Sequence, residues 1–322
     1  MSILRAWKLN GKGGGAPLNR SEVAEALAKN EQVWLHLDAA ATSTRKLLME
    51  LGAHFDNEAI SALTAKDTRP RVLRLAKGLL INLRTINFNV EADPADMVSA
   101  RIWIDAETIL SVRMRRLRET QVIESRIKDG TGPESADSFL VLFITEMVQS
   151  LEQQLLTQAD TVDGLELELI EDKLDLSVRK SAMALRRQMI AYRRHLIPQR
   201  DMLSSLLRED VSFISRVNYH KLQDLHDQVT RHVEEIEVLR ERSLMITEEI
   251  TSHYSERQNR NMYILSMVAA IFLPLSFLTG LLGINVGGIP GATNLDAFYI
   301  FCGLLVLVSL LQFVIFKKLK WL

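Results

Sequence analysis

The residues with the clearest chemical potential form a short string, Gly283-Ile284-Asn285, between two uncharged segments. An asparagine side chain offers a carbonyl oxygen, and a ring of such oxygens can hold a divalent cation through the water molecules that the ion carries. Gly283 permits the tight backbone that such a ring needs. A lone Gly-x-Asn string is more often an ordinary turn after a helix, so the flanking segments must decide between the two interpretations.

Other possible ligands and catalytic groups are weaker candidates. His36 and Asp38 alternate along a predicted strand, so both side chains lie on one face and can chelate zinc, but two ligands are too few for a structural site. The spacing of His220, His226 and His232 points three rings in different directions on a helix, which favours solvated or interhelical histidines. We find no catalytic set and expect neither an enzyme nor a cofactor.

The charge of the chain is balanced but unevenly distributed. Its 39 Lys and Arg residues and 40 Asp and Glu residues give a net charge of -1, which argues against a nucleic-acid partner. Between Asn261 and Phe316, Asp296 is the only charged residue.

The glycine-rich run 11–15 lacks the residue order of a phosphate-binding loop, and we interpret it as a hairpin tip.

Two uncharged segments near the end of the chain, 261–283 and 297–316, each have about the 20 residues that a bilayer requires. The connection 284–296 contains no Lys or Arg, so the positive-inside rule places it outside and both chain ends in the cytoplasm. The basic residues behind this prediction are Arg257, Arg260, Lys317, Lys318 and Lys320.

The first uncharged segment contains a proline, and this has a structural consequence. Pro274 frees the carbonyl group of Ala270, which another helix or pore water can satisfy.

Two helices cannot enclose a water-filled path, so ion conduction would require several chains around a common axis.

The preceding residues predict an α/β domain over 1–132 and a helical stalk over 133–260. The strand-type runs come partly in adjacent pairs, which favours a mixed or antiparallel sheet. A helix over 176–207 is expected to be interrupted at Pro198. No proline or glycine occurs between Phe213 and Leu273, so one helix should continue into the first membrane segment and pack against partner helices.

The string FLTGLLGINVGGIPG resembles the CorA superfamily of divalent-cation transporters, whose usual signature at this place is Gly-Met-Asn. The Gly-Ile-Asn version followed by VGGIPG is similar to the zinc-transporter ZntB branch. The strings VWLHLDA, LTAKDTRPRV and INFNVEADPADMVSARIWID are also similar to that branch, so the resemblance covers most of the chain.

The resemblance implies an α+β fold class. It comprises a cytoplasmic α/β/α domain with a largely antiparallel sheet, a long helical stalk that lines a funnel, and two C-terminal transmembrane helices. It also implies a homopentamer in the lipid of a bacterial inner membrane, with the first transmembrane helix lining the pore and the second outside it. Proton-coupled uptake of Zn²⁺ is implied as well.

The resemblance assigns roles to particular residues. Gly283, Ile284 and Asn285 become the selectivity filter, and residues 317–322 become a basic cytoplasmic tail. Its three lysines, Lys317, Lys318 and Lys320, would form a basic ring facing an acidic stretch that begins at Asp160. The alternative for the acidic stretch is a solvated helix face.

Helical spacing back from Asn285 predicts one pore-lining face of the first transmembrane helix. We call this set the pore stripe: Gly280, Ser276, Leu273, Ala269, Leu265, Met262 and Asn259. Its inner, apolar part lacks ligands and could gate by dewetting. The alternative is an ordinary lipid-facing or packing face; the rival faces are bulkier and contain Phe272, Leu275, Phe277 and Leu281.

The sequence leaves alternatives for both the transported ion and the functional class. Zinc prefers nitrogen and sulfur ligands, whereas the pore stripe and filter offer oxygen donors and one thioether. A channel for Mg²⁺, Co²⁺ or Ni²⁺ is therefore the alternative ion assignment. Neither membrane segment holds Asp, Glu, His, Lys or Arg, so a proton relay of the usual kind is missing. A membrane-anchored sensor or scaffold is the alternative class.

Overall fold

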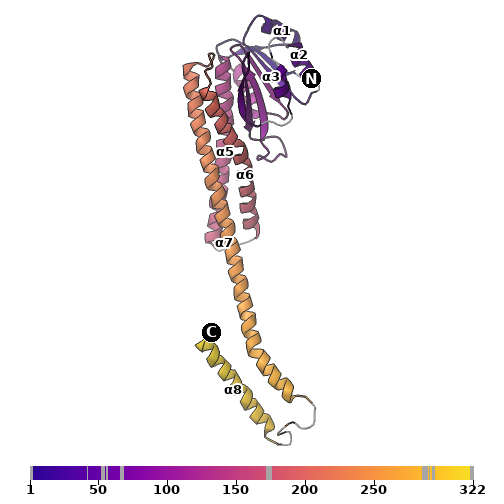
Figure 1. The fold of residues 1–322 in the computed structure, drawn as a ribbon, viewed down its shortest axis with the longest axis vertical. Coiled ribbons are helices and arrows are strands. Elements are labelled where there is room, and N and C mark those ends of the chain that lie inside the picture. Colours follow the sequence, from indigo (N-terminus) through magenta and orange to yellow (C-terminus); the bar gives the residue numbers. More distant parts are fainter. Residues whose placement is uncertain are drawn as a thin grey trace. The chain divides into compact units, whose positions relative to one another are not determined.

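A computed structural model describes residues 3–41, 43–51, 55, 57–65, 69–171, 176–284, 289, 291 and 294–319. The chain divides into an N-terminal unit, Met1–Thr247, and a C-terminal unit, Glu248–Leu322. Helix α7, Arg216–Leu282, contributes residues to both units as one continuous element of 67 residues (Figure 1). This continuity confirms the expectation from a stretch without proline or glycine before Leu273.

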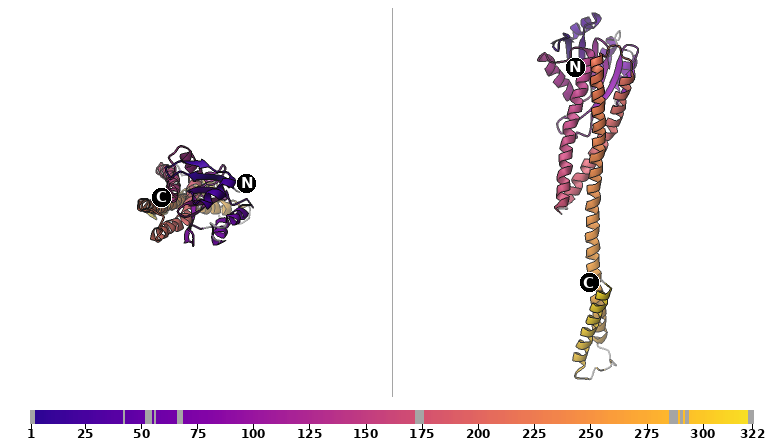
Figure 2. Two further views of the ribbon diagram at one scale, coloured as in Figure 1. Left: turned by 90° about the horizontal axis from the view of Figure 1, so that it is seen from above. Right: turned by 90° about the vertical axis from the view of Figure 1, so that its left-hand side faces the viewer.

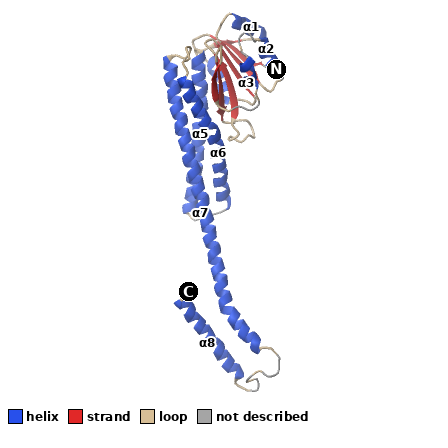
Figure 3. Ribbon diagram, in the orientation of Figure 1, coloured by secondary structure: helices blue, strands red, loops and turns tan. Residues whose placement is uncertain are grey.

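The N-terminal unit contains a seven-stranded sheet (Figure 3). In spatial order its strands are β2, β1, β3, β7, β6, β5 and β4. Only the pair β3 and β7 is parallel, so the largely antiparallel sheet is confirmed. The strands are β1 Ile3–Leu9, β2 Gly15–Pro17, β3 Val33–Asp38, β4 Arg71–Arg74, β5 Leu79–Thr85, β6 Val98–Ile104 and β7 Thr108–Arg113.

Helices cover both faces of this sheet. Successive side chains of a buried strand point to opposite faces, so both faces are apolar and need cover. In β5, Leu79 and Ile81 join a core with α4 to α7, whereas Leu80 joins a core with α1 to α3. The α/β/α arrangement is thereby confirmed. The remaining helices are α1 Arg20–Ala28, α2 Ser43–Glu50, α3 Asn57–Thr64, α4 Arg118–Lys128, α5 Ala136–Ile170, α6 Leu176–Arg208 and α8 Ala297–Lys318.

Helix α6 is continuous, so the expected interruption at Pro198 is wrong. A proline inside a helix costs about 3 kcal/mol through the lost hydrogen bond and the steric clash. Leu196 and Leu203, on either side of it, are fully buried, and each buried leucine contributes about 1.5–3 kcal/mol. Burial of the apolar face on both sides therefore outweighs the local cost of the proline.

One hydrophobic core joins the sheet to the long helices. It includes Trp34 of β3, Phe139 of α5, Leu203 of α6 and Leu225 of α7. Helices α5 and α6 lie side by side with the first part of α7 (Figure 2). The predicted boundary at residue 132 stays an interpretation of the chain's organisation, since the segments on its two sides share this core.

The glycine-rich run forms the predicted hairpin tip between β1 and β2. Gly13 has a positive φ of 83°, and a Cβ atom there would lie 2.7 Å from the carbonyl oxygen of Gly130. The Gly13 carbonyl accepts a hydrogen bond from Gly132 N at 2.7 Å. The glycines therefore allow the tip to dock against the turn between α4 and α5, a role that needs no phosphate.

A carboxylate fixes the beginning of α5 to the beginning of α7. Asp137 Oδ2 accepts hydrogen bonds from Ser215 N at 2.9 Å and from Asn218 Nδ2 at 2.8 Å. Burial alone would raise the pKa of Asp137, but the hydrogen bonds from Ser135, Ser215 and Asn218 together lower it below its usual value. The ionised form of Asp137 is thus the form that stabilises the fold.

We predict that Asp137→Ala lowers the free energy of unfolding by about 2 kcal/mol at neutral pH, the usual contribution of hydrogen bonds to a charged group. Because the folded-state pKa is lowered, this contribution is fully present above the unfolded-state pKa of about 3.9. It is lost as the pH falls through the folded-state value. Urea unfolding of the full chain in detergent, followed by tryptophan fluorescence at pH 7 and at lower pH, measures both effects.

Asp201→Ala is the matched control, because Asp201 is exposed and its carboxylate pairs only with its neighbour Arg200 among the described residues. An exposed pair of this kind contributes about 0–1 kcal/mol. Equal destabilisation by the two variants, or a difference at Asp137 that persists unchanged in acid, would contradict the assignment.

Candidate ion-conducting segment

The C-terminal unit is built from the last part of α7 and from α8, which run antiparallel (Figure 1). Both helices are long and apolar enough to cross a membrane, and the most apolar window of each is not buried within the chain. Large side chains such as Leu265, Phe277 and Leu307 are more than 60% exposed. Such surfaces are stable only against lipid or other protein chains.

The two helices meet along one face of each, which we call the hairpin contact face. On α7 its half-buried residues recur at helical spacing: Met267, Ala270, Ile271, Leu275 and Leu278. On α8 the corresponding residues are Ala297, Phe301, Cys302, Leu305, Val308, Ser309, Gln312 and Phe316. Phe316 is the most buried of them, at 8% exposure. Every third or fourth residue therefore faces the partner helix.

The pore stripe lies on a different face of α7. All seven of its residues, from Asn259 to Gly280, are exposed in the single chain. At about 100° of rotation per residue, the mean direction of the stripe is roughly opposite to that of the hairpin contact face. Helix α8 therefore leaves the stripe uncovered. The rival residues Phe272, Phe277 and Leu281 are exposed as well, whereas Leu275 belongs to the contact face.

The carbonyl group that Pro274 frees finds its partner on α8. Gln312 Nε2 donates a long hydrogen bond of 3.4 Å to Ala270 O. Of the two partners expected for this carbonyl, helix or water, the structure shows the helix. Gln312 is a site residue that spacing did not predict. Its signal in the sequence was an amide side chain in an otherwise apolar segment, opposite a segment with a proline. Gln312 Oε1 has no partner among the described residues.

Two glycines near the end of α7 differ in what they permit. The backbone N–H of Gly283 donates to Thr279 O at 2.9 Å, and a Cβ atom on Gly283 would lie 2.7 Å from that same oxygen. A Cβ atom on Gly280 would meet no heavy atom of the described residues within 4 Å, apart from the backbone of its own helix. Gly283 is thus required by the backbone of its own helix end, whereas Gly280 leaves space for something outside the chain.

Several predicted site residues fall at the ends of the described segments. Ile284 is 50% exposed and is the last residue of the described range 176–284. Asn285 and Lys320 lie outside the described residues. Lys317 and Lys318 are exposed at the end of α8. The filter and the basic ring therefore stay predictions.

The geometry around His36 gives no support to a metal at the His36 and Asp38 pair. His36 is buried, and its Nδ1 lies 2.8 Å from Ser111 Oγ. Burial, with Arg113 and Arg5 nearby, lowers the pKa of His36 to about 3. Among the described residues, no group of three or more His, Cys, Asp or Glu side chains is arranged to hold a metal ion.

Part of the acidic stretch is neutralised within the N-terminal unit. Arg242 of α7 donates to Asp163 and to Glu166 of α5, each at 2.6 Å. These two carboxylates raise the pKa of the Arg242 guanidinium above its usual value. This pairing favours a structural role for Asp163 and Glu166. The proposed contact of the stretch with the basic ring stays a prediction.

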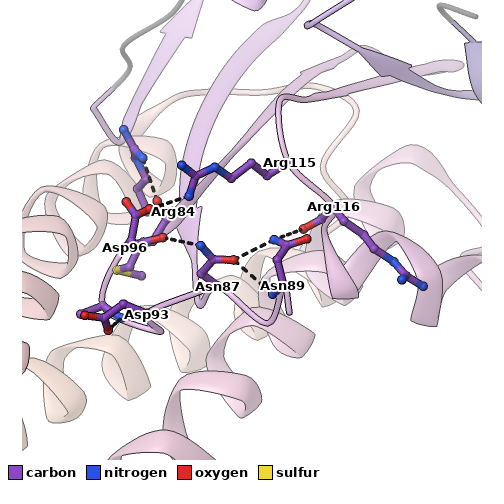
Figure 4. Close-up of polar contacts among 9 residues, drawn as sticks. Arg84, Asn87, Asn89, Asp93, Asp96, Arg115 and Arg116 are labelled. Atoms are coloured by element: carbon purple, nitrogen blue, oxygen red, sulfur yellow. Dashed lines mark hydrogen bonds and ion pairs between the residues drawn. The ribbon is translucent and has the colours of Figure 1, made fainter. Parts of the chain in front are cut away.

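The string INFNVEADPADM forms a loop tied by side-chain amides, between β5 and β6 (Figure 4). Asn87 Nδ2 donates to Asp96 O at 3.0 Å, and Asn87 Oδ1 accepts from Asn89 Nδ2 at 2.7 Å. Arg115 reaches Asp96 Oδ2 at 2.5 Å. The polar residues of this string therefore hold the loop in shape.

Comparison with known proteins assigns the chain to a family. The family model described as "CorA-like Mg2+ transporter protein" matches residues 29–318. The chain belongs to the CorA family. Members of this family are membrane transporters of divalent cations, not enzymes, and they carry two membrane spans at the C-terminal end.

Curated relatives match nearly the whole chain. The divalent cation transporter CmaX of Pseudomonas aeruginosa is 36% identical, with 99% of this chain and 97% of the relative covered. The zinc transport protein ZntB of Pectobacterium carotovorum subsp. carotovorum is 33% identical, with 99% and 96% covered.

Solved structures of this family share the fold. The full-length CmaX structure matches with a TM-score of 0.86 at 35% identity, over 99% of this chain and 98% of that one. The CorA magnesium transporter of Methanocaldococcus jannaschii matches with a TM-score of 0.80 at 19% identity over the full length of both chains. The latter likeness shows the fold alone.

We predict that Gln312→Leu destabilises the C-terminal unit by about 1 kcal/mol, the usual range for hydrogen bonds between membrane helices. The same change should cost much less in a Pro274→Ala background, because alanine at 274 restores the backbone N–H that bonds to Ala270 O within α7. Unfolding of the detergent-solubilised protein, in a double-mutant cycle, measures the coupling.

Ser309→Ala serves as a control, because the Ser309 hydroxyl bonds to Leu305 O of its own helix. It should show no coupling to Pro274→Ala. Independent, additive effects of Gln312→Leu and Pro274→Ala would show that the hydrogen bond between the helices contributes nothing to stability.

Proposed function

We propose that this CorA-family protein takes up zinc through a pore formed by five copies of the chain, with Asn285 of each copy at the outer selectivity filter. The observation that carries the proposal is the arrangement of the membrane hairpin. Helix α8 covers one face of α7 and leaves the pore stripe uncovered on the opposite side. In a ring of hairpins, that face is free to line a common axis while α8 faces outward.

The chemistry of the stripe suits a path for a hydrated ion. Near the filter, Gly280 and Ser276 are small or polar, so the path is wide and wettable there. Further in, Leu273, Ala269 and Leu265 make an apolar constriction that can close by dewetting. The space that Gly280 leaves open permits close approach at the axis. A ring of Asn285 amide oxygens then binds the ion's water shell without removing it.

Zinc is the proposed ion because relatives that match the chain almost end to end are named as zinc transport proteins. A hydrated-ion filter of oxygen atoms does not by itself favour zinc, which prefers nitrogen and sulfur donors. The description of the matching family names Mg²⁺, so magnesium transport is the alternative, with Co²⁺ and Ni²⁺ in the same class.

The proposed orientation puts the N-terminal unit and the basic tail on the cytoplasmic side of a bacterial inner membrane. The positions of Arg257, Arg260 and the tail lysines support it, because the connection between the helices contains no Lys or Arg. With an inside-negative potential of 100 mV, entry of a divalent cation is favoured by roughly 4.6 kcal/mol. Proton coupling enters the proposal from the likeness to the zinc branch, since neither span carries an ionisable relay group.

We predict that Asn285→Ala reduces zinc entry into proteoliposomes at least tenfold, because it removes the amide oxygens of the filter. The assay uses liposomes loaded with a zinc-sensitive dye, with and without an inward proton gradient, and parallel measurements with Mg²⁺. Faster zinc entry under the proton gradient is expected if uptake is coupled.

Asn294→Ala is the matched control, because Asn294 lies in the same outer connection and caps the backbone N–H of Asp296 at 3.0 Å. It should keep at least half of the wild-type flux. Equal zinc flux in Asn285→Ala and Asn294→Ala would show that Asn285 is not part of the filter. Magnesium entry without zinc entry would favour the magnesium alternative, and absence of both would favour a tethered sensor or scaffold.

A second prediction tests the pore stripe. Cysteine introduced at Ser276 should react with water-borne thiol reagents in the membrane-embedded protein, whereas cysteine at Phe277 should not. Ser276 belongs to the stripe and Phe277 to a rival face, and only the thiolate in contact with water reacts. The measurement is the labelled fraction per chain against time, and equal reactivity at the two positions would contradict the stripe.

A further inference from the structure

A basic pocket in the N-terminal unit stands apart from the transport path. It has a volume of about 170 Å³ and lies between the sheet and the first turns of α4. Residues from β1, β3 and β7 form one side, and residues of α4 form the other. The ionisable side chains that line it are Arg5, His36, Arg113, Arg116 and Glu124.

The pocket carries an excess of positive charge. Arg5 is paired with Glu124 at 2.6 Å, and Lys128 pairs with the same carboxylate at 2.9 Å. Arg113 is half-buried, and its guanidinium makes no hydrogen bond or ion pair in the described part of the chain. Burial lowers the pKa of Arg113, as do the nearby cations Arg116 and Arg5, and Asp38 offsets this only in part. Three arginines thus converge with too few carboxylates to balance them.

A buried histidine adds an unused polar atom. His36 is 2% exposed, and its Nε2 has no partner among the described residues. Ser111 Oγ accepts a hydrogen bond from Trp34 Nε1, and its own proton can go to His36 Nδ1 at 2.8 Å or to Leu35 O at 3.3 Å. When the Ser111 hydroxyl donates along the shorter contact, to Nδ1, the neutral ring carries its hydrogen on Nε2.

The position of that hydrogen relates it to the pocket. Nδ1 is the ring nitrogen nearer the strand and is used by Ser111 on the neighbouring strand. Nε2 is the far end of the ring and is itself buried, and His36 is one of the residues that line the pocket. A buried N–H group without a partner costs about 1–3 kcal/mol, so an acceptor in the pocket would stabilise the domain.

We propose that this pocket binds a small oxyanion of the phosphate type, held by the guanidinium groups of Arg113 and Arg116 and by the Nε2–H of His36. Arginine matches the oxygens of a phosphoryl group with paired N–H donors. A metal cation at the same place would face three arginines. The site is independent of the proposed transport function, since its residues all lie in the N-terminal unit.

A neighbouring hollow leaves room for more than the phosphoryl group. It has a volume of about 310 Å³, is lined by Phe88 and Arg118, and shares Arg116 and Gln121 with the basic pocket. The bound group is therefore a phosphoryl group, either as inorganic phosphate or as part of a phosphate ester whose organic part occupies the second hollow.

The test is calorimetric titration of the full-length protein in detergent with inorganic phosphate and, separately, with a nucleoside monophosphate. We expect saturable binding of one phosphoryl group per chain. Arg113→Gln and Arg116→Gln should each weaken it at least tenfold. Tighter binding of the ester, lost in Phe88→Ala, would assign the ester as the source; equal or weaker binding of the ester would assign free phosphate.

Arg115→Gln is the matched control. Arg115 and Arg116 are adjacent and both exposed, but their side chains point in opposite directions, Arg115 toward Asp96 and Arg116 away from it (Figure 4). Arg115→Gln should keep the wild-type affinity within about twofold. Because Arg116 is exposed, Arg116→Gln tests the pocket even if substitution of the half-buried Arg113 impairs folding.

Three results would overturn the proposal. The first is absence of saturable binding at millimolar concentrations of phosphate and of the ester. The second is equal weakening by Arg116→Gln and Arg115→Gln, which would indicate non-specific attraction to positive charge. The third is binding of zinc, titrated alone, that disappears in His36→Gln, which would assign the pocket to a metal ion.

Discussion

A lipid bilayer offers no hydrogen-bond partners to a backbone, and this constraint governs the C-terminal unit. Pro274 opens one gap in the hydrogen-bond ladder of α7, and Gln312 closes it from α8. The bond lies on the face of α7 that meets α8, and the opposite face is left over. That remaining face includes Gly280 and Ser276, two small positions of the span, the second of them polar. The exposed apolar surface of the hairpin must then be covered by lipid or by further chains.

The N-terminal unit supplies a firm base for the start of α7. Leu225 and Val229 of this helix belong to the core that also holds the strand residue Trp34. Asp137 ties the same helix to α5 through charged hydrogen bonds. Arg242 adds an ion-pair cluster with Asp163 and Glu166 further along. Hydrophobic burial gives these helices their stability, and the polar contacts select one register among them.

Much of the fold is predictable because its hydrophobic patterns are strong. The buried run of β5, with Leu80 facing opposite to Leu79 and Ile81, and the long proline-free stretch of α7 are examples. Strand β2 was missed, since three residues, Gly15–Pro17, carry no periodic signal. The interruption predicted at Pro198 was wrong because local helix propensity does not include the burial of Leu196 and Leu203. In the candidate site, the stripe followed from spacing, but the role of Gln312 required knowing which helix lies opposite Ala270.

The continuity of α7 has a mechanical consequence. A helix with all its backbone hydrogen bonds resists bending. A rotation or a shift at one end is therefore transmitted to the other end. Within its 67 residues the ladder lacks the N–H rung of Pro274, inside the membrane segment. The missing hydrogen bond makes α7 easier to bend at this point, and the Gln312 amide is the described side chain that bonds to the freed carbonyl of Ala270. One proline and one glutamine therefore set the local stiffness of α7 at this point, although neither belongs to the pore stripe.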